Sequence, residues 1–182
     1  MRLIDLTLPI HDGMDVYPGD PPVRVRQVRD LSESGWRLSE ISFGSHTGTH
    51  VNAPWHMAED GKRLDQIPLS GFVGRAVVRG GGLYRAGMGI IYASAPLDVE
   101  ELGIVIRSRP AFVAQAAEFP MDEEVERGLC EAGIVSFENL ANTSELPRGR
   151  TFLFAGLPLA VGGDGAPVRA MAMLGVMETM RD

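Results

Sequence analysis

The chain has 182 residues and a net charge of −7, with 45% hydrophobic and 23% charged residues. This composition is typical of a single globular domain over residues 1–182, large enough to bury a core, and it excludes a disordered or fibrous chain. Because no basic stripe exists to meet phosphates, we expect a small-molecule partner rather than nucleic acid or a membrane.

The N-terminus lacks the basic start and the apolar run of a secretory signal, and no stretch reaches the length of a membrane span. The single cysteine, Cys130, has no partner for an internal disulfide. It follows Leu129 in a helical pattern, so we expect it to pack rather than act as a nucleophile. These features predict a cytoplasmic protein.

Residues 15–22 predict a rigid turn, because Pro-Gly sets a bend and Pro21-Pro22 offers no donors to a sheet. In residues 23–26, valines alternate with arginines, which predicts a strand with one wet face. Residues 41–43 alternate in the same way and lead into Gly44, which predicts a half-buried strand that ends at this glycine.

Three of the four histidines, His46, His50 and His56, follow that strand within eleven positions. Gly48, the β-branched threonines beside it and Pro54 disfavour a helix, so we expect the histidines on an irregular loop or strand end. Imidazole is a common metal ligand and titrates near neutrality. The cluster therefore indicates metal binding or acid/base chemistry rather than ordinary surface histidines.

The string His-Thr-Gly-Thr-His-Val-Asn-Ala-Pro-Trp-His resembles the signature of the cyclase family of metal-dependent hydrolases, which includes bacterial kynurenine formamidase and isatin hydrolase. The family signature reads His-x-Gly-Thr-His-x-Asp-x-Pro-x-His. Every specified position matches except Asn52, which stands where the family carries aspartate. The resemblance implies that His46 and His50 bind a metal ion and that His56 is a general base.

The segment around Tyr17 and Pro18 is similar to the family's Pro-Gly-Asp-x-Pro segment, which lies close to the substrate pocket. By this resemblance the two residues wall the pocket, with a purely structural turn as the alternative. We also assign substrate contacts to Thr49 and Trp55. Trp55 and Tyr17 suggest an apolar or aromatic ligand, although such residues equally serve as core.

Downstream, the pattern predicts strands at 76–78 and 90–92, with a loop rather than a phosphate-binding cradle at 80–82. It then predicts a short helix at 97–102 that is broken at Gly103. A second helix is predicted from its N-cap Asp122 to Gly133, followed by a strand at 134–137. This last strand leads into Glu138. A glutamate there is either a solvated strand terminus or an acid directed into a pocket.

Glu138-Asn139-Leu140 resembles the family's Glu-x-Leu, whose glutamate is a metal ligand, and residues 162–170 resemble its Gly-x-Asp-Gly-x-Pro-Val-Arg turn. The resemblance implies a mixed α/β fold of the swivelling β/β/α type, with a twisted β-barrel-like core flanked by helices. It also implies assembly as a homodimer or homotetramer.

The chain departs from the two-metal members of this family at two points. Asn52 replaces the aspartate that bridges both ions, and no histidine follows His56, although those members carry a further histidine upstream of Glu-x-Leu. A neutral amide cannot offset the repulsion between two dications. We therefore expect at most one ion, zinc or manganese, on His46, His50 and Glu138, with Asn52 as a weak ligand.

Three functions remain open. The first is hydrolysis of a small cyclic or aryl amide or formamide by a metal-activated water, with His56 as general base. The second is a metal-independent cyclase, dehydratase or isomerase, in which the histidines carry protons while Thr49 and Asn52 orient a carbonyl. The third is a catalytically inactive homologue that binds a small molecule.

Overall fold

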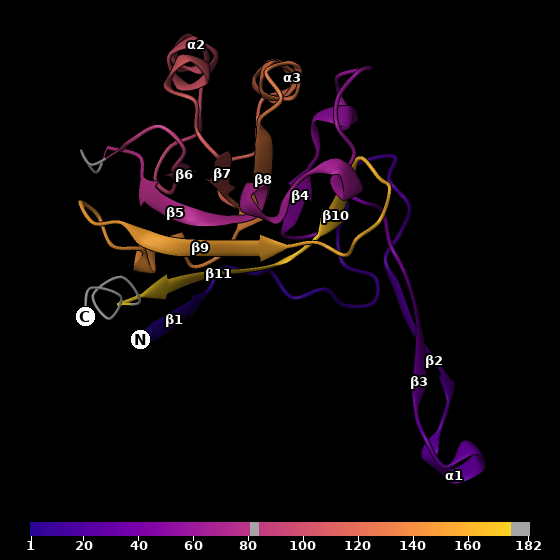
Figure 1. The fold of residues 1–182 in the computed structure, drawn as a ribbon. Coiled ribbons are helices and arrows are strands. Elements are labelled where there is room, and N and C mark those ends of the chain that lie inside the picture. Colours follow the sequence, from indigo (N-terminus) through magenta and orange to yellow (C-terminus); the bar gives the residue numbers. More distant parts are fainter. Residues whose placement is uncertain (81–83, 176–182) are drawn as a thin grey trace.

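The computed structural model describes residues 1–80 and 84–175, in which one large sheet carries few helices (Figure 1). The elements in chain order are β1 (Arg2–Asp5), β2 (Arg24–Arg29), α1 (Leu31–Ser34), β3 (Leu38–Ser42), β4 (His50–Asn52), β5 (Val73–Val78), β6 (Gly89–Tyr92), α2 (Val99–Ser108), β7 (Phe112–Ala116), α3 (Glu123–Glu131), β8 (Val135–Leu140), β9 (Phe152–Leu157), β10 (Gly165–Pro167) and β11 (Arg169–Leu174). The prediction of mixed α and β structure is confirmed.

Nine strands form the main sheet in the order β1-β11-β9-β5-β6-β7-β8-β4-β10. The middle strands β5 to β8 are parallel, and the pairs toward both edges are antiparallel. The sheet curls strongly into a half-barrel, as the barrel-like prediction expected (Figure 1). Strands β4 and β10 stand at one edge, where the histidine segment enters the sheet.

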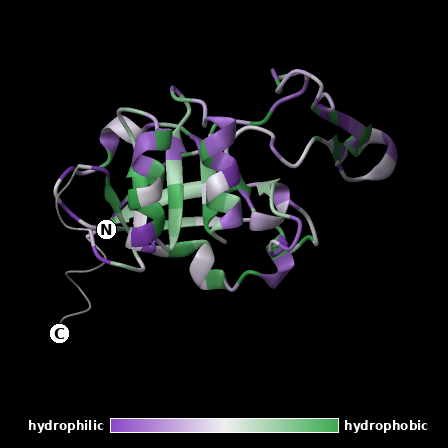
Figure 2. Cartoon of the chain, turned by 90° about the horizontal axis from the view of Figure 1, so that it is seen from above, coloured by the Kyte–Doolittle hydropathy of each residue, from purple (hydrophilic) through white to green (hydrophobic). Residues whose placement is uncertain are grey.

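Helices α2 and α3 connect the parallel strands β6, β7 and β8 and cover one face of the sheet (Figure 1). Each begins at an aspartate whose carboxylate accepts a backbone N–H, at Asp98 and Asp122. Their apolar side chains pack on the sheet with Ile90 and Val113, and their hydrophilic faces point outward (Figure 2). The predicted helix from Asp122 is confirmed.

A second core fills the opposite face of the curled sheet. Phe112, Phe137 and Phe154 lie at its centre, with ring centroids 4.9 to 5.4 Å apart. Gly89 leaves room for this cluster, because a Cβ there would lie 2.2 Å from the ring of Phe112. Phe137 belongs to β8, so this cluster also fixes the position of the neighbouring Glu138.

The predicted break at Gly103 is wrong, because α2 continues through this glycine to Ser108. One glycine in a helix interior costs about 1 kcal/mol, and the N-cap and the burial of Val105 offset that cost. Gly81 and Gly82 of the predicted loop lie outside the described residues. None of the helices in the described part of the chain has the length and apolar character needed to cross a bilayer.

Strands β2 and β3 correct the prediction of strands with one buried face. They pair with each other in a separate two-stranded sheet, and all of their residues are exposed. Together with α1 they form an arm, residues 24–42, that projects away from the main sheet (Figure 1). Because the hairpin projects away from the main sheet, neither of its faces packs on the core, even though its apolar and polar residues alternate.

Candidate metal centre

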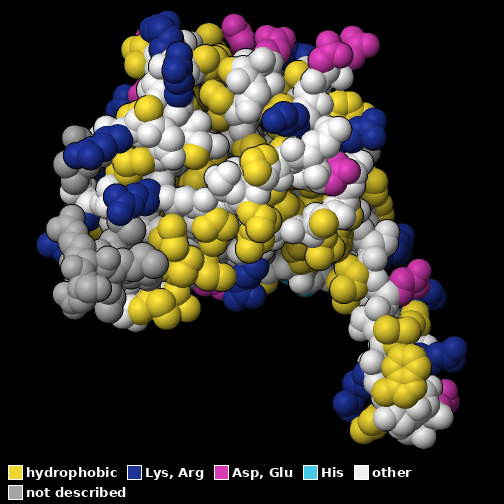
Figure 3. Space-filling view, viewed as in Figure 1, with side chains coloured by type: hydrophobic (Ala, Val, Ile, Leu, Met, Phe, Trp, Pro, Cys, Tyr) yellow, Lys and Arg dark blue, Asp and Glu magenta, His cyan; other side chains and the backbone are white. Residues whose placement is uncertain are grey.

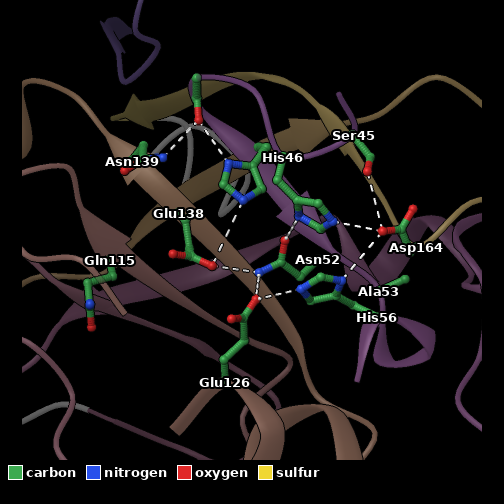
Figure 4. Close-up of polar contacts among 12 residues, drawn as sticks. Ser45, His46, Asn52, Ala53, His56, Gln115, Glu126, Glu138, Asn139 and Asp164 are labelled. Carbon is green, nitrogen blue, oxygen red and sulfur yellow. Dashed lines mark hydrogen bonds and ion pairs between the residues drawn. The ribbon is translucent and has the colours of Figure 1, made fainter. Parts of the chain in front are cut away.

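Strand β4 and its neighbour β8 present the first part of the centre. The two strands are antiparallel, and His50 is the direct cross-strand partner of Glu138. Because side chains alternate along a strand, His50, Asn52 and Glu138 lie on the same face, while Val51 packs into the core. Figure 4 shows Asn52 and Glu138 pointing toward each other. His46 lies in the irregular turn before β4, as the sequence predicted.

Thr49 fixes this turn to the rest of the fold. Its hydroxyl donates to the carbonyl oxygen of Asn139 at 2.6 Å and accepts the backbone N–H of Leu8 at 2.8 Å. The side-chain amide of Asn139 donates in turn to the carbonyl oxygen of Gly48 at 3.1 Å. With 1% of its surface exposed, Thr49 is in a position to hold the loop in place.

Replacement of Thr49 by valine is therefore expected to lower the free energy of unfolding by about 1–3 kcal/mol, because two buried hydrogen-bonding groups lose their partner. Chemical denaturation followed by circular dichroism measures this change. Thr49→Ser keeps the hydroxyl and is the matched control. Unchanged stability in Thr49→Val together with a raised KM would instead support the substrate contact predicted from the sequence.

Two acids join the centre from distant segments. Glu126 reaches it from α3, and Asp164 reaches it from the loop before β10 (Figure 4). Neither residue was assigned a role from the sequence. The signals present were that Glu126 lies upstream of Glu138, where the family pattern carries a further histidine, and that Asp164 is the aspartate of the Gly-x-Asp-Gly turn.

The fully buried side-chain amide of Asn52 orients the centre. Its nitrogen donates to Glu126 Oε1 and to Glu138 Oε1, both at 2.6 Å, which uses both amide hydrogens. The amide oxygen then faces Nδ1 of His46 at 2.9 Å. We therefore assign the proton of His46 to Nδ1, which leaves the lone pair on Nε2.

Nε2 of His46 points at a carboxylate. It lies 2.8 Å from Asp164 Oδ2, and Nδ1 of His56 lies 3.4 Å from the same oxygen. Lone pairs this close repel each other unless a proton or a metal ion lies between them. The arrangement therefore calls for a cation.

The donor atoms of His46, His56 and Asp164 all lie within 4.8 Å of one another, the one such group of His, Cys, Asp or Glu found among the described residues. Zinc bonds of about 2.0–2.2 Å set tetrahedral ligand atoms about 3.3–3.6 Å apart. The 3.4 Å between His56 Nδ1 and Asp164 Oδ2 lies in that range, and the 2.8 Å at His46 is shorter. The residues fit a single divalent ion.

Both histidines also have the outer contacts that ligating histidines need. The other ring nitrogen of His46 faces Asn52, and that of His56 lies 3.4 Å from Glu126 Oε1. An acceptor at this position fixes the tautomer and the ring orientation of a ligand. Burial lowers the pKa of His56, which favours the neutral imidazole that binds metals.

The Asn52 side of the centre is rich in carboxyl groups. Burial, together with the neighbouring charge of Glu138, raises the pKa of Glu126 to about 8. Burial also lowers the pKa of His50, whose Nδ1 lies 2.8 Å from the carbonyl oxygen of Gly48. Its Nε2 lies 3.9 Å from Glu138 Oε1. The ligand roles predicted for His50 and Glu138 remain predictions, since Nε2 of His46 points to Asp164 instead.

The predicted substrate residues differ in their exposure and contacts. Trp55 is 37% exposed, with the guanidinium of Arg63 lying 4.1 Å from its ring centroid. Tyr17 is 78% exposed, and it and Pro18 belong to the predicted turn, where the N–H of Asp20 donates to the carbonyl of Tyr17. The turn is confirmed, and the contacts of these residues with substrate remain predictions.

The sequence and the fold of this chain were compared with those of known proteins. Residues 4–79 match the model of the putative cyclase family. The chain is 31% identical to a kynurenine formamidase of Salinibacter ruber, covering 94% of this chain and 97% of that protein. The fold resembles isatin hydrolase A of Labrenzia aggregata, with a TM-score of 0.80, 21% identity and coverage of 94% and 93%. It also resembles a potential metal-dependent hydrolase with cyclase activity, with a TM-score of 0.74, 23% identity and coverage of 94% and 96%.

Proposed function

The chain belongs to the cyclase family, and we propose that it is a metal-dependent hydrolase that cleaves the C–N bond of a small cyclic or aryl amide or formamide. The observation that carries the proposal is that one ligand atom from each of His46, His56 and Asp164 lies within 4.8 Å of the other two. Relatives named as kynurenine formamidase and isatin hydrolase support the choice of an amide bond.

His46, His56 and Asp164 would hold the ion, which we propose to be zinc or manganese because imidazole and carboxylate ligands suit both. A divalent ion at such a centre polarises an amide carbonyl and brings the pKa of water to about 7. The buried free Cys130 has no role in this chemistry, and it agrees with the cytoplasmic location that we retain as a proposal.

Neighbouring side chains would orient the two histidine ligands toward the ion. Asn52, held by Glu126 and Glu138, keeps the proton of His46 on Nδ1. Glu126 faces Nε2 of His56 and so keeps the other nitrogen of that ring toward Asp164. The half-exposed ring of Trp55 offers an aromatic face to an aryl substrate.

The ligand set assigned from the sequence shares only His46 with this one. It gives the ion to His46, His50 and Glu138 and leaves His56 free as the general base. Nε2 of His50 and Oε1 of Glu138 lie 3.9 Å apart, which supports their binding of one metal ion. Both assignments use His46, so other residues must discriminate between them.

The proposed activity is tested with the formamide of kynurenine and with isatin-type lactams as substrates, before and after chelation. We expect chelation to abolish turnover and added zinc or manganese to restore it. Elemental analysis of the chelated protein confirms removal of the ion. Full turnover without the ion would support the metal-independent cyclase, dehydratase or isomerase, and no turnover on any substrate would support the inactive binding homologue.

We further expect purified protein to bind no more than one ion tightly, because the Asn52 amide lies between Glu126 and Glu138 and cannot bridge two dications. Calorimetric metal titration measures the stoichiometry. Asn52→Asp and Glu126→His alone should each keep one tight site, whereas the double variant should gain a second one. Two tight sites in the unaltered protein or in Asn52→Asp alone would contradict this reasoning.

A further inference from the structure

Strand β8 is irregular next to Glu138. Its pairing with β7 shifts there, so that Glu138 and Asn139 together oppose one residue of β7. Phe137 and Leu140 consequently lie in the same core, although strict alternation would put them on opposite faces. This is a β-bulge, and bulges next to active sites redirect side chains. Figure 4 shows Glu138 directed toward Asn52 and Asn139 directed away from it.

Asn139 supplies the backbone conformation of this bulge. Its φ of 57° lies in the left-handed region, which glycine adopts freely and asparagine adopts more readily than most other residues. The other non-glycine residues with positive φ in the described part of the chain, Arg109 and Asn142, flank helices. A left-handed residue inside a strand is unusual, and such residues gather at functional sites. Asn139 therefore indicates a functional constraint beside Glu138.

The side chain of Asn139 shares an acceptor with His50. Its amide nitrogen donates to the carbonyl oxygen of Gly48 at 3.1 Å, and Nδ1 of His50 lies 2.8 Å from the same oxygen. A carbonyl oxygen only accepts hydrogen bonds, and it has two lone pairs. Nδ1 of His50 therefore carries a proton, and the two donors together use both lone pairs.

Water has little access to the imidazole of His50. The residue is 4% exposed, and hardly any histidine surface appears on the face drawn in Figure 3. The protein itself must therefore decide which ring nitrogen of His50 carries the proton. The Gly48 carbonyl makes that choice as long as it faces Nδ1.

Asn139 holds this carbonyl through two adjacent residues of the turn before β4. Its amide binds the Gly48 carbonyl, and its own carbonyl accepts the hydroxyl of Thr49 at 2.6 Å. Gly48 is also left-handed, with φ of 60°, a conformation in which few other residues would fit. The two bonds from Asn139 fix the plane of the peptide that joins Gly48 to Thr49.

We propose that Asn139 is a positioning residue, which holds the Gly48 carbonyl against Nδ1 of His50 and so directs the lone pair of Nε2 toward Glu138. Nε2 lies 3.9 Å from Glu138 Oε1, and the two residues are cross-strand partners. A lone pair at this place can bind a divalent ion or accept a proton. In that respect the role of Asn139 rests on the proposed function.

Proton–nitrogen NMR spectra of the imidazole rings test this role in the chelated protein, because an ion on Nε2 would itself force the proton onto Nδ1. Protonated and unprotonated ring nitrogens differ in chemical shift, and comparison with His50→Gln identifies the signals of His50 among those of the four histidines. We expect one neutral tautomer in the unaltered protein, with the proton on Nδ1.

Two variants remove the donor of Asn139 by different means. Asn139→Gly suits the φ of 57°, and Asn139→Asp keeps the size of the side chain but cannot donate when ionised. We expect both to show a mixture of His50 tautomers. In the protein that contains its ion, kcat should fall about 10- to 100-fold, the range for a lost outer contact, with KM nearly unchanged.

Asn142→Gly is the matched control. Asn142 has a φ of 54°, and its amide donates to the carbonyl of Asp5 at 2.9 Å, but it is exposed and bonds outside the centre. This variant should change neither the tautomer nor kcat. Circular dichroism checks that all variants are folded.

Three results would overturn the role of Asn139. They are a proton on Nε2 of His50 in the unaltered protein, a single Nδ1-protonated tautomer in both Asn139 variants, and a loss of stability in these variants with no change in tautomer or kcat. The tautomer is measured without substrate, so it tests Asn139 separately from the proposed hydrolysis.

Discussion

Substitution of His46 by alanine is expected to remove the bound ion and to lower turnover by more than about 100-fold, beyond the 10–100-fold cost of an outer contact. The reason is geometric, because Nε2 of His46 has the shortest contact with Asp164, at 2.8 Å, and both ligand assignments include this residue. Elemental analysis and turnover of the same preparation measure both effects. A full equivalent of ion in His46→Ala would contradict every assignment made for this centre.

Two isosteric variants then separate the assignments. Asp164→Asn should lose the ion if it is held by His46, His56 and Asp164, while Glu138→Gln should retain it. The opposite pattern would favour the ligand set inferred from the sequence, with His50 and Glu138. Both changes preserve side-chain volume, so differential scanning calorimetry should show similar folding cooperativity and leave metal content as the discriminating result.

The sequence predicted the part of the centre that is local in the chain. His46, His50, Asn52 and His56 lie within eleven positions, so a single irregular turn and one short strand bring them together. The period of two along β4 then puts His50 and Asn52 on one face. Glu138 was reached through the resemblance to the Glu-x-Leu segment, and its pairing with His50 gives that resemblance a physical basis.

Two acids of the centre, Glu126 and Asp164, were not predicted from the sequence. Glu126 and Asp164 contact residues 74 and 118 positions away in the chain. Their approach depends on the curl of the nine-stranded sheet and on the pairing of β10 with β4, which periodicity does not encode. On α3, Glu126 follows the buried Val125 in an otherwise acidic first turn, so its inward direction had no local signal.

The arm marks a second limit. Alternating residues in 23–26 and 41–43 predicted half-buried strands, and the strands exist, but of these residues only Val23, which precedes β2, is buried, and every residue of β2 and β3 is exposed. Periodicity indicates that a face is suited to burial without identifying the molecule that buries it.

His56→Ala is expected to reduce turnover by about 10²- to 10⁴-fold, the range typical of a lost proton carrier, and its metal content decides what His56 does. As a ligand, His56 contributes Nδ1 at 3.4 Å from Asp164, so its loss should remove the ion together with the activity. As the predicted general base, its loss should leave a full equivalent of ion in an inactive protein. His11→Ala is the matched control, since His11 is exposed and outside the cluster, and it should change neither quantity. Normal turnover in His56→Ala would exclude both roles, because each places this imidazole in contact with the reacting centre.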